Sequence, residues 1–60
     1  MKNELMEALI TQGRTREEVE IVYQELHTIF NDHLDEGDIM GAYEVLSLVG
    51  LEPDYIMDLI

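Results

Sequence analysis

The residues best suited to hold a metal ion gather near the middle of the chain. They are Asp32, His33, Asp35, Glu36 and Asp38. A calcium loop of the EF-hand type needs oxygen ligands at alternate positions, glycine at the sixth and an acid at the twelfth. Counted from Asp32, Gly37 stands at the sixth position, but Leu34 takes the third and Tyr43 the twelfth. The cluster therefore fits a solvated acidic helix end, and we expect no metal site.

The remaining reactive side chains do not form a catalytic set. His27 and His33 are six positions apart, which places them on different faces of a helix and not at the spacing of paired zinc ligands. Ser47 is the only serine, and no histidine lies near it in the sequence. No glycine-rich phosphate loop is present. We therefore expect a non-enzymatic protein with no catalytic residue and no cofactor.

The charge of the chain is its most unusual property. Fourteen acids oppose three bases, Lys2, Arg14 and Arg16, which gives a formal net charge of −11. Nucleic acids and anionic membranes are bound through lysine and arginine, so this charge argues against both. It favours a protein partner with a basic surface, although the acids could equally serve only to keep the protein soluble.

Length and composition limit the fold further. Sixty residues form one domain at most, so we take residues 1–60 as a single domain. Cysteine is absent, and 47% of the residues are hydrophobic, which is a large apolar fraction for so short a chain. No apolar run approaches the ~20 residues that a membrane-spanning helix needs. We expect a cytoplasmic protein that associates with another molecule.

The spacing of the apolar residues predicts a helical hairpin in the first half of the chain. Apolar side chains recur at three- and four-residue steps over about residues 2–12 and 16–35. Gly13 between them favours a left-handed end to the first helix. Thr15 and Glu18 have the spacing of a capping box, in which each side chain binds the backbone amide of the other.

Two further helices are expected to close this hairpin into a small all-α bundle. They cover about residues 39–48 and 53–59, with Gly37 and Asp38 separating the hairpin from the third helix. The third helix is apolar nearly all round, which is typical of a helix at the centre of a core or covered by a second chain. From this pattern we predict a homodimer.

These patterns give two candidate binding surfaces. The acidic face comprises Glu18, Glu25, Asp32, Asp35 and Glu36. The apolar surface, which would be either a dimer seam or a docking groove, comprises Ile39, Met40, Tyr43, Leu46, Tyr55, Ile56 and Leu59. The sequence alone does not distinguish these two uses, because both require the same side chains.

Part of the hairpin resembles a known family. Gly13-Arg14-Thr15 is followed by Glu18-Val19 and then by Tyr23-Gln24-Glu25-Leu26-His27. This stretch, within about residues 5–34, resembles the small sporulation-regulating aspartyl-phosphate phosphatases, two-helix proteins with a Ser-Gln-Glu-Leu-Asp signature. The resemblance implies docking on a response regulator and loss of its phosphate. Tyr23 replaces the signature serine and His27 the aspartate, and residues 39–60 have no counterpart.

The leading interpretation is a small acidic protein-binding module, an inhibitor or adaptor of the kind that phages encode. One form of it is a nucleic-acid mimic, in which carboxylates imitate phosphates. The enzyme-class alternative is a phosphatase-like regulator of response regulators. A third interpretation is a self-assembling structural protein whose apolar third helix is buried entirely in contacts between copies of the chain.

Overall fold

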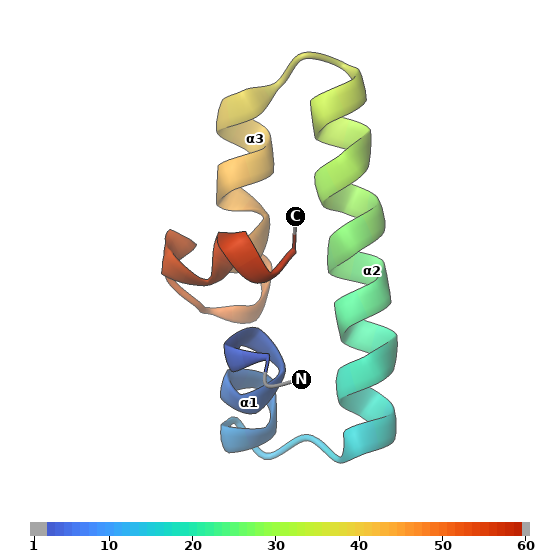
Figure 1. Cartoon of the computed structure of the whole chain (residues 1–60), viewed down its shortest axis with the longest axis vertical. Coiled ribbons are helices and arrows are strands. Elements are labelled where there is room, and N and C mark those ends of the chain that lie inside the picture. Colours follow the sequence, from blue (N-terminus) through green and yellow to red (C-terminus); the bar gives the residue numbers. More distant parts are fainter. Residues whose placement is uncertain (1–2, 60) are drawn as a thin grey trace.

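The computed structural model describes residues 3–59, which form a small all-α bundle, as the sequence predicts. Figure 1 shows the long helix α2 running the full height of the molecule, with the other elements stacked along one side of it. The elements are the helices α1 (Glu4–Thr11), α2 (Arg16–Asp35) and α3 (Ile39–Glu44), followed by the 3₁₀ helices η1 (Val45–Val49) and η2 (Pro53–Asp58). The predicted first residue of α1, Lys2, lies outside the described residues.

The last third of the chain departs from the predicted α-helices. The helix expected over 39–48 is α-helical only to Glu44 and then tightens into η1, which ends at Gly50 with a left-handed φ of 74°. The helix expected over 53–59 is the 3₁₀ helix η2, with Pro53 in its first turn. Short 3₁₀ segments are common at the ends of α-helices and in connections, and spacing of apolar residues alone does not reveal them.

The turn between α1 and α2 is built as the sequence predicts. Gly13 has a φ of 103°, a left-handed conformation that ends α1. The Thr15 hydroxyl accepts a hydrogen bond from the amide of Glu18 at 3.2 Å. The amide of Thr15 in turn donates to the carboxylate of Glu18 at 2.9 Å, which completes the capping box.

A single core joins all five elements. Each element places one or more side chains in it. Its buried hydrophobic residues are Leu5, Leu9, Val19, Leu26, Phe30, Ala42, Val45, Leu46, Ile56 and Leu59. α1 covers the first half of α2 and α3 covers the second half, with η2 between them (Figure 1).

The C-terminal segment is tied to both helices of the hairpin through Asp58. The Asp58 carboxylate accepts a hydrogen bond of 3.0 Å from the amide of Leu5, in the first turn of α1. The Tyr23 hydroxyl, on α2, donates to the Asp58 carbonyl at 2.6 Å. A carboxylate at a helix N-terminus satisfies an amide that has no partner within the helix and complements the helix dipole. Asp58 therefore links α1, α2 and η2.

We expect Tyr23→Phe to lower the free energy of unfolding by about 1 kcal/mol, because it removes this hydrogen bond and keeps the ring. Urea denaturation followed by circular dichroism measures the change. Tyr55→Phe is the matched control, since the structure records no hydrogen bond for its hydroxyl and the loss there should be clearly smaller. Equal losses in the two variants would contradict the role given to Tyr23.

The capping box also makes stability depend on pH. The Thr15 amide, and then its hydroxyl, lower the pKa of the Glu18 carboxyl below the ordinary value of 4.5, and Arg14 adds to this effect. A carboxyl whose pKa is lowered by folding stabilises the folded state above its unfolded pKa. That stabilisation is lost as the pH falls through the folded pKa.

Glu18→Gln should therefore be less stable than the wild type at neutral pH, and the difference should shrink as the pH falls below about 4.5. Urea titrations of both proteins at several pH values between about 3 and 7 test this expectation. A stability difference that stays constant over this range would show that the carboxylate charge contributes nothing to the cap.

Candidate functional site

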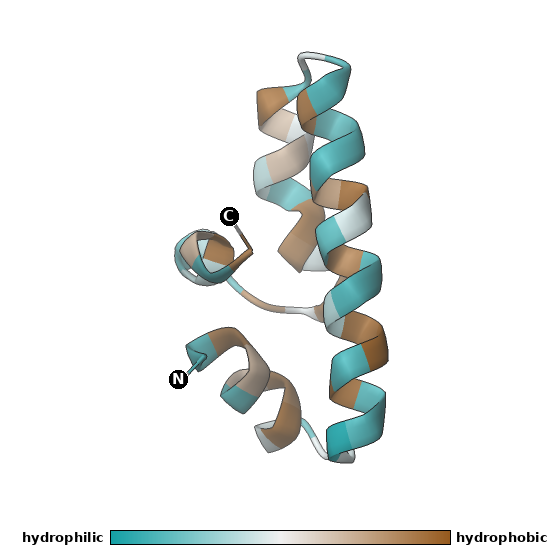
Figure 2. Cartoon of the chain, turned by 45° about the vertical axis from the view of Figure 1, so that its right-hand side comes forward, coloured by the Kyte–Doolittle hydropathy of each residue, from teal (hydrophilic) through white to brown (hydrophobic). Residues whose placement is uncertain are grey.

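Four of the eight large exposed apolar side chains within residues 3–59 lie together at the end of the molecule where α2 meets α3. They surround a groove of about 240 Å³ formed by the end of α2, by α3 and by η2. The lining residues are Phe30, Leu34, Ile39, Ala42, Tyr43, Ile56 and Met57. The hydropathy colouring in Figure 2 shows a hydrophobic stretch at the start of α3, beside the end of α2, which is mostly hydrophilic there. We call this feature the apolar groove.

The groove has a buried floor and an exposed rim. Phe30, Ala42 and Ile56 form the floor and belong to the core. The rim residues remain largely open to solvent, with exposed fractions of 43% for Leu34, 61% for Ile39, 53% for Tyr43 and 73% for Met57. Large exposed apolar side chains that line one concave surface are typical of binding sites, whereas scattered ones are common on any protein.

The structure corrects part of the predicted apolar surface. Ile39, Met40 and Tyr43 are exposed, as a binding surface requires. Leu46 and Leu59, by contrast, are 0% and 1% exposed. Their prediction as surface residues is wrong, because the bend from α3 into η1 and the return of η2 fold both side chains into the core.

Two other predicted residues contribute little surface, and two residues of the groove rim were not predicted. Ile56 is 6% exposed and lies in the floor of the groove. Tyr55 is half-buried and packs against the core. Leu34 and Met57 were missed, because Leu34 continues the apolar row of α2 and Met57 is one apolar residue among several in its segment.

The acidic face lies on α2, apart from the floor of the groove. Glu18, Glu25 and Asp32 are exposed and recur every seven residues, which places them in one row with steps of about 10 Å. Asp35 and Glu36 are exposed at the end of the helix, beside the turn to α3. The Glu18 carboxylate is occupied by the capping box. The row therefore offers separated charges, and its use in binding stays a prediction.

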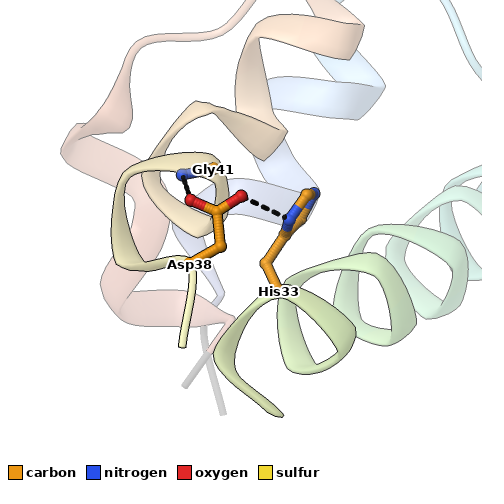
Figure 3. A network of polar contacts seen from close by, with 3 residues as sticks. All are labelled: His33, Asp38 and Gly41. Carbon is orange, nitrogen blue, oxygen red and sulfur yellow. Dashed lines mark hydrogen bonds and ion pairs between the residues drawn. The ribbon is translucent and has the colours of Figure 1, made fainter. Parts of the chain in front are cut away.

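The predicted acid and histidine cluster forms a local turn network, drawn in Figure 3. One carboxylate oxygen of Asp38 accepts from the Gly41 amide at 2.8 Å, which caps α3. The other lies 3.2 Å from Nδ1 of His33, at the end of α2. Within residues 3–59, no group of three or more histidines and acids is placed to hold a metal ion. This network therefore joins α2 to α3.

Some residues of the stretch that resembles the phosphatases make contacts within the fold, and others are exposed to solvent. The Tyr23 ring stacks on that of His27 with 6.3 Å between the ring centroids. Nδ1 of His27 lies 3.1 Å from the side-chain nitrogen Nδ2 of Asn31. Gln24 and Glu25 are exposed on the outer side of α2. With its hydroxyl bound to the Asp58 carbonyl, Tyr23 contributes to the fold.

No family model, curated protein or solved structure matched this chain. None of the helices within residues 3–59 has both the length and the apolar character required to span a bilayer. The candidate site therefore rests on the geometry of the chain itself.

The turn network leads to a prediction at Gly41, in the first turn of α3. An added Cβ would lie 2.3 Å from the Asp38 carboxylate and 2.8 Å from Nδ1 of His33, so the carboxylate would have to move and release its cap. Alanine inside a helix is more favourable than glycine by about 1 kcal/mol of folding free energy. Loss of an N-cap destabilises the folded protein by about the same amount. We expect Gly41→Ala to give no net stabilisation.

The same substitution in an Asp38→Ala background should stabilise by up to about 1 kcal/mol, because the cap is already absent and only the His33 ring, no longer held by Asp38, has to move away from the added Cβ. Thermal unfolding of the four proteins in this double-mutant cycle measures the coupling. Identical effects of Gly41→Ala in both backgrounds would show that Asp38 does not determine the preference for glycine.

Proposed function

We propose that this protein is a non-enzymatic binding module that acts as an inhibitor or adaptor by docking its apolar groove on a partner protein. The observation that carries the proposal is the convergence of four exposed rim side chains on one concave apolar surface. Burying a single large apolar side chain contributes roughly 1.5–3 kcal/mol of favourable free energy. The exposed rim side chains can therefore contribute to the free energy of binding a partner. The formal net charge of −11 favours a basic surface on the partner.

The fold of the single chain supports this use of the groove. Leu46 and Leu59 are buried and complete the core of the single chain. Folding therefore does not require the apolar groove to be filled. The apolar character of the third helix was the reason to predict a homodimer. Ala42, Val45 and Leu46 are buried inside the chain, whereas Ile39, Met40, Tyr43 and Leu48 remain exposed. A homodimer stays a prediction, as do the phosphatase-like, nucleic-acid-mimic and self-assembling alternatives.

A pull-down with matched variants tests the proposal. Ile39→Gln combined with Tyr43→Gln removes two rim side chains, and glutamine preserves helix propensity. Ile21→Gln is the control, because Ile21 is 60% exposed, like Ile39 at 61%, but lies on α2 outside the groove. We expect proteins from the native host to be retained by the wild type and the control and lost by the groove variant.

The pull-down is run at low and high salt, with circular dichroism to confirm that all three proteins fold. Docking through apolar anchors should largely survive high salt, whereas mimicry of nucleic acid should fail steeply. Retention of the same host proteins by the groove variant and the wild type would contradict the proposal.

A further inference from the structure

Three elements form the apolar groove, and η2 is the one with the least structure of its own. α2 and α3 each begin with a side-chain cap, at Thr15 and Asp38. η2 is a six-residue 3₁₀ helix that begins at Pro53 without a side-chain cap. Hydrogen bonds in 3₁₀ helices have poorer geometry than those in α-helices. The position of η2 therefore depends on its contacts with the rest of the chain.

Two hydrogen bonds join η2 to α1 and α2 within residues 3–59, and both involve Asp58. The Leu5 amide donates to the Asp58 carboxylate at 3.0 Å, and the Tyr23 hydroxyl donates to the Asp58 carbonyl at 2.6 Å. The apolar anchors at this end of the chain are Ile56 and Leu59, which are 6% and 1% exposed. A segment held by few buried side chains can open while the rest of a domain stays folded.

η2 also connects α1 to the apolar groove. It packs against α1, η1 and α3, and Figure 1 shows it between α1 and α3. The seven residues that line the groove include Ile56 and Met57 of η2. In the same short helix, Asp58 holds the Leu5 amide of α1. Movement of η2 away from α1 would therefore withdraw two of the seven lining side chains.

We propose that η2 is a movable wall of the apolar groove, and that Asp58 is the clasp that keeps it seated against α1 and α2. In the seated state, Ile56 closes the floor of the groove together with Phe30 and Ala42. In the open state, the Leu5 amide loses its partner and the floor is exposed to solvent. The inference goes beyond the proposed function, because it concerns how the groove is maintained with or without a partner.

Amide hydrogen exchange of the wild-type protein, followed by NMR, tests whether η2 opens on its own. The Leu5 amide reports on the clasp, and the Leu59 amide, which donates to the Ile56 carbonyl at 3.0 Å, reports on η2. The Leu26 amide, inside α2, reports on global unfolding. We expect Leu5 and Leu59 to be protected at least about tenfold less than Leu26, with little dependence on low concentrations of urea.

Equal protection of the three amides, falling together as urea is added, would contradict this expectation. It would show that η2 leaves its place only when the whole protein unfolds, and the movable wall would be overturned.

A matched pair of variants tests the role of Asp58. Asp58→Ala removes the clasp, whereas Asp54→Ala removes an exposed acid of the same helix and gives the same net charge. Hydrogen bonds to charged groups are stronger than neutral ones, so we expect Asp58→Ala to speed exchange at Leu59 by about tenfold or more. Asp54→Ala should change it less than about twofold. Equal effects of the two variants would overturn the clasp.

Tyr23→Phe is a milder variant that keeps the carboxylate of Asp58. It removes only the hydrogen bond to the Asp58 carbonyl, so we expect exchange at Leu5 to rise by about fivefold. An unchanged rate at Leu5 would show that the two bonds of Asp58 do not act together, and would contradict the proposal even if Asp58→Ala failed to fold.

A single thiol reports on the groove itself, because the chain contains no cysteine of its own. Ala42 is 1% exposed and lies in the floor, so Ala42→Cys places a thiol that the seated wall should protect. We expect iodoacetamide to label it at least about fivefold faster in the Asp58→Ala background than in the Asp54→Ala background. The rate should depend little on low concentrations of urea.

Equal labelling in the two backgrounds would show that Asp58 does not control the groove, and would overturn the proposal. A labelling rate that rises with urea as steeply as global unfolding does would overturn it as well. These measurements require no partner protein. Their outcome is therefore independent of whether the pull-down supports the proposed function.

Discussion

The structure depends on how a long amphipathic helix is covered by much shorter partners. α2 has 20 residues, whereas α1 has eight and α3 has six. At 1.5 Å per residue, α2 is about 30 Å long, and neither short helix can cover more than half of it. The two helices therefore share its apolar face, and the 3₁₀ segments fill the space between them. The end of α2 at Leu34 remains only partly covered, and the groove forms there.

This arrangement separates the contacts that maintain the fold from those available to a partner. The contact of Asp38 with His33 and the bonds of Asp58 to Leu5 and Tyr23 hold the short elements together and against α2. The side chains that remain exposed at the rim are not needed for these contacts. A small domain buries a smaller share of its surface than a large one, so it leaves apolar side chains exposed that can take part in association.

The sequence predicted the elements well and the direction of individual side chains less well. Gly13, Thr15 and Glu18 act locally, so their pattern identified the hairpin turn. The orientation of Leu46 and Leu59 depends on the bend into η1 and on the return of η2, which no local spacing encodes. The link from Asp58 to Leu5 spans 53 positions and was equally invisible. An apolar residue can thus be recognised from sequence more easily than the face on which it lies.

The central claim is that the apolar groove contacts another protein, and crosslinking in the native host tests it most directly. A photoreactive phenylalanine analogue placed at Tyr43 reports on the groove, and the same residue at Ile21 reports on the outer side of α2. The account predicts an adduct of this 7.0 kDa chain with a different protein from position 43 and none from position 21. Absence of an adduct at position 43, or equal adducts from both positions, would contradict it.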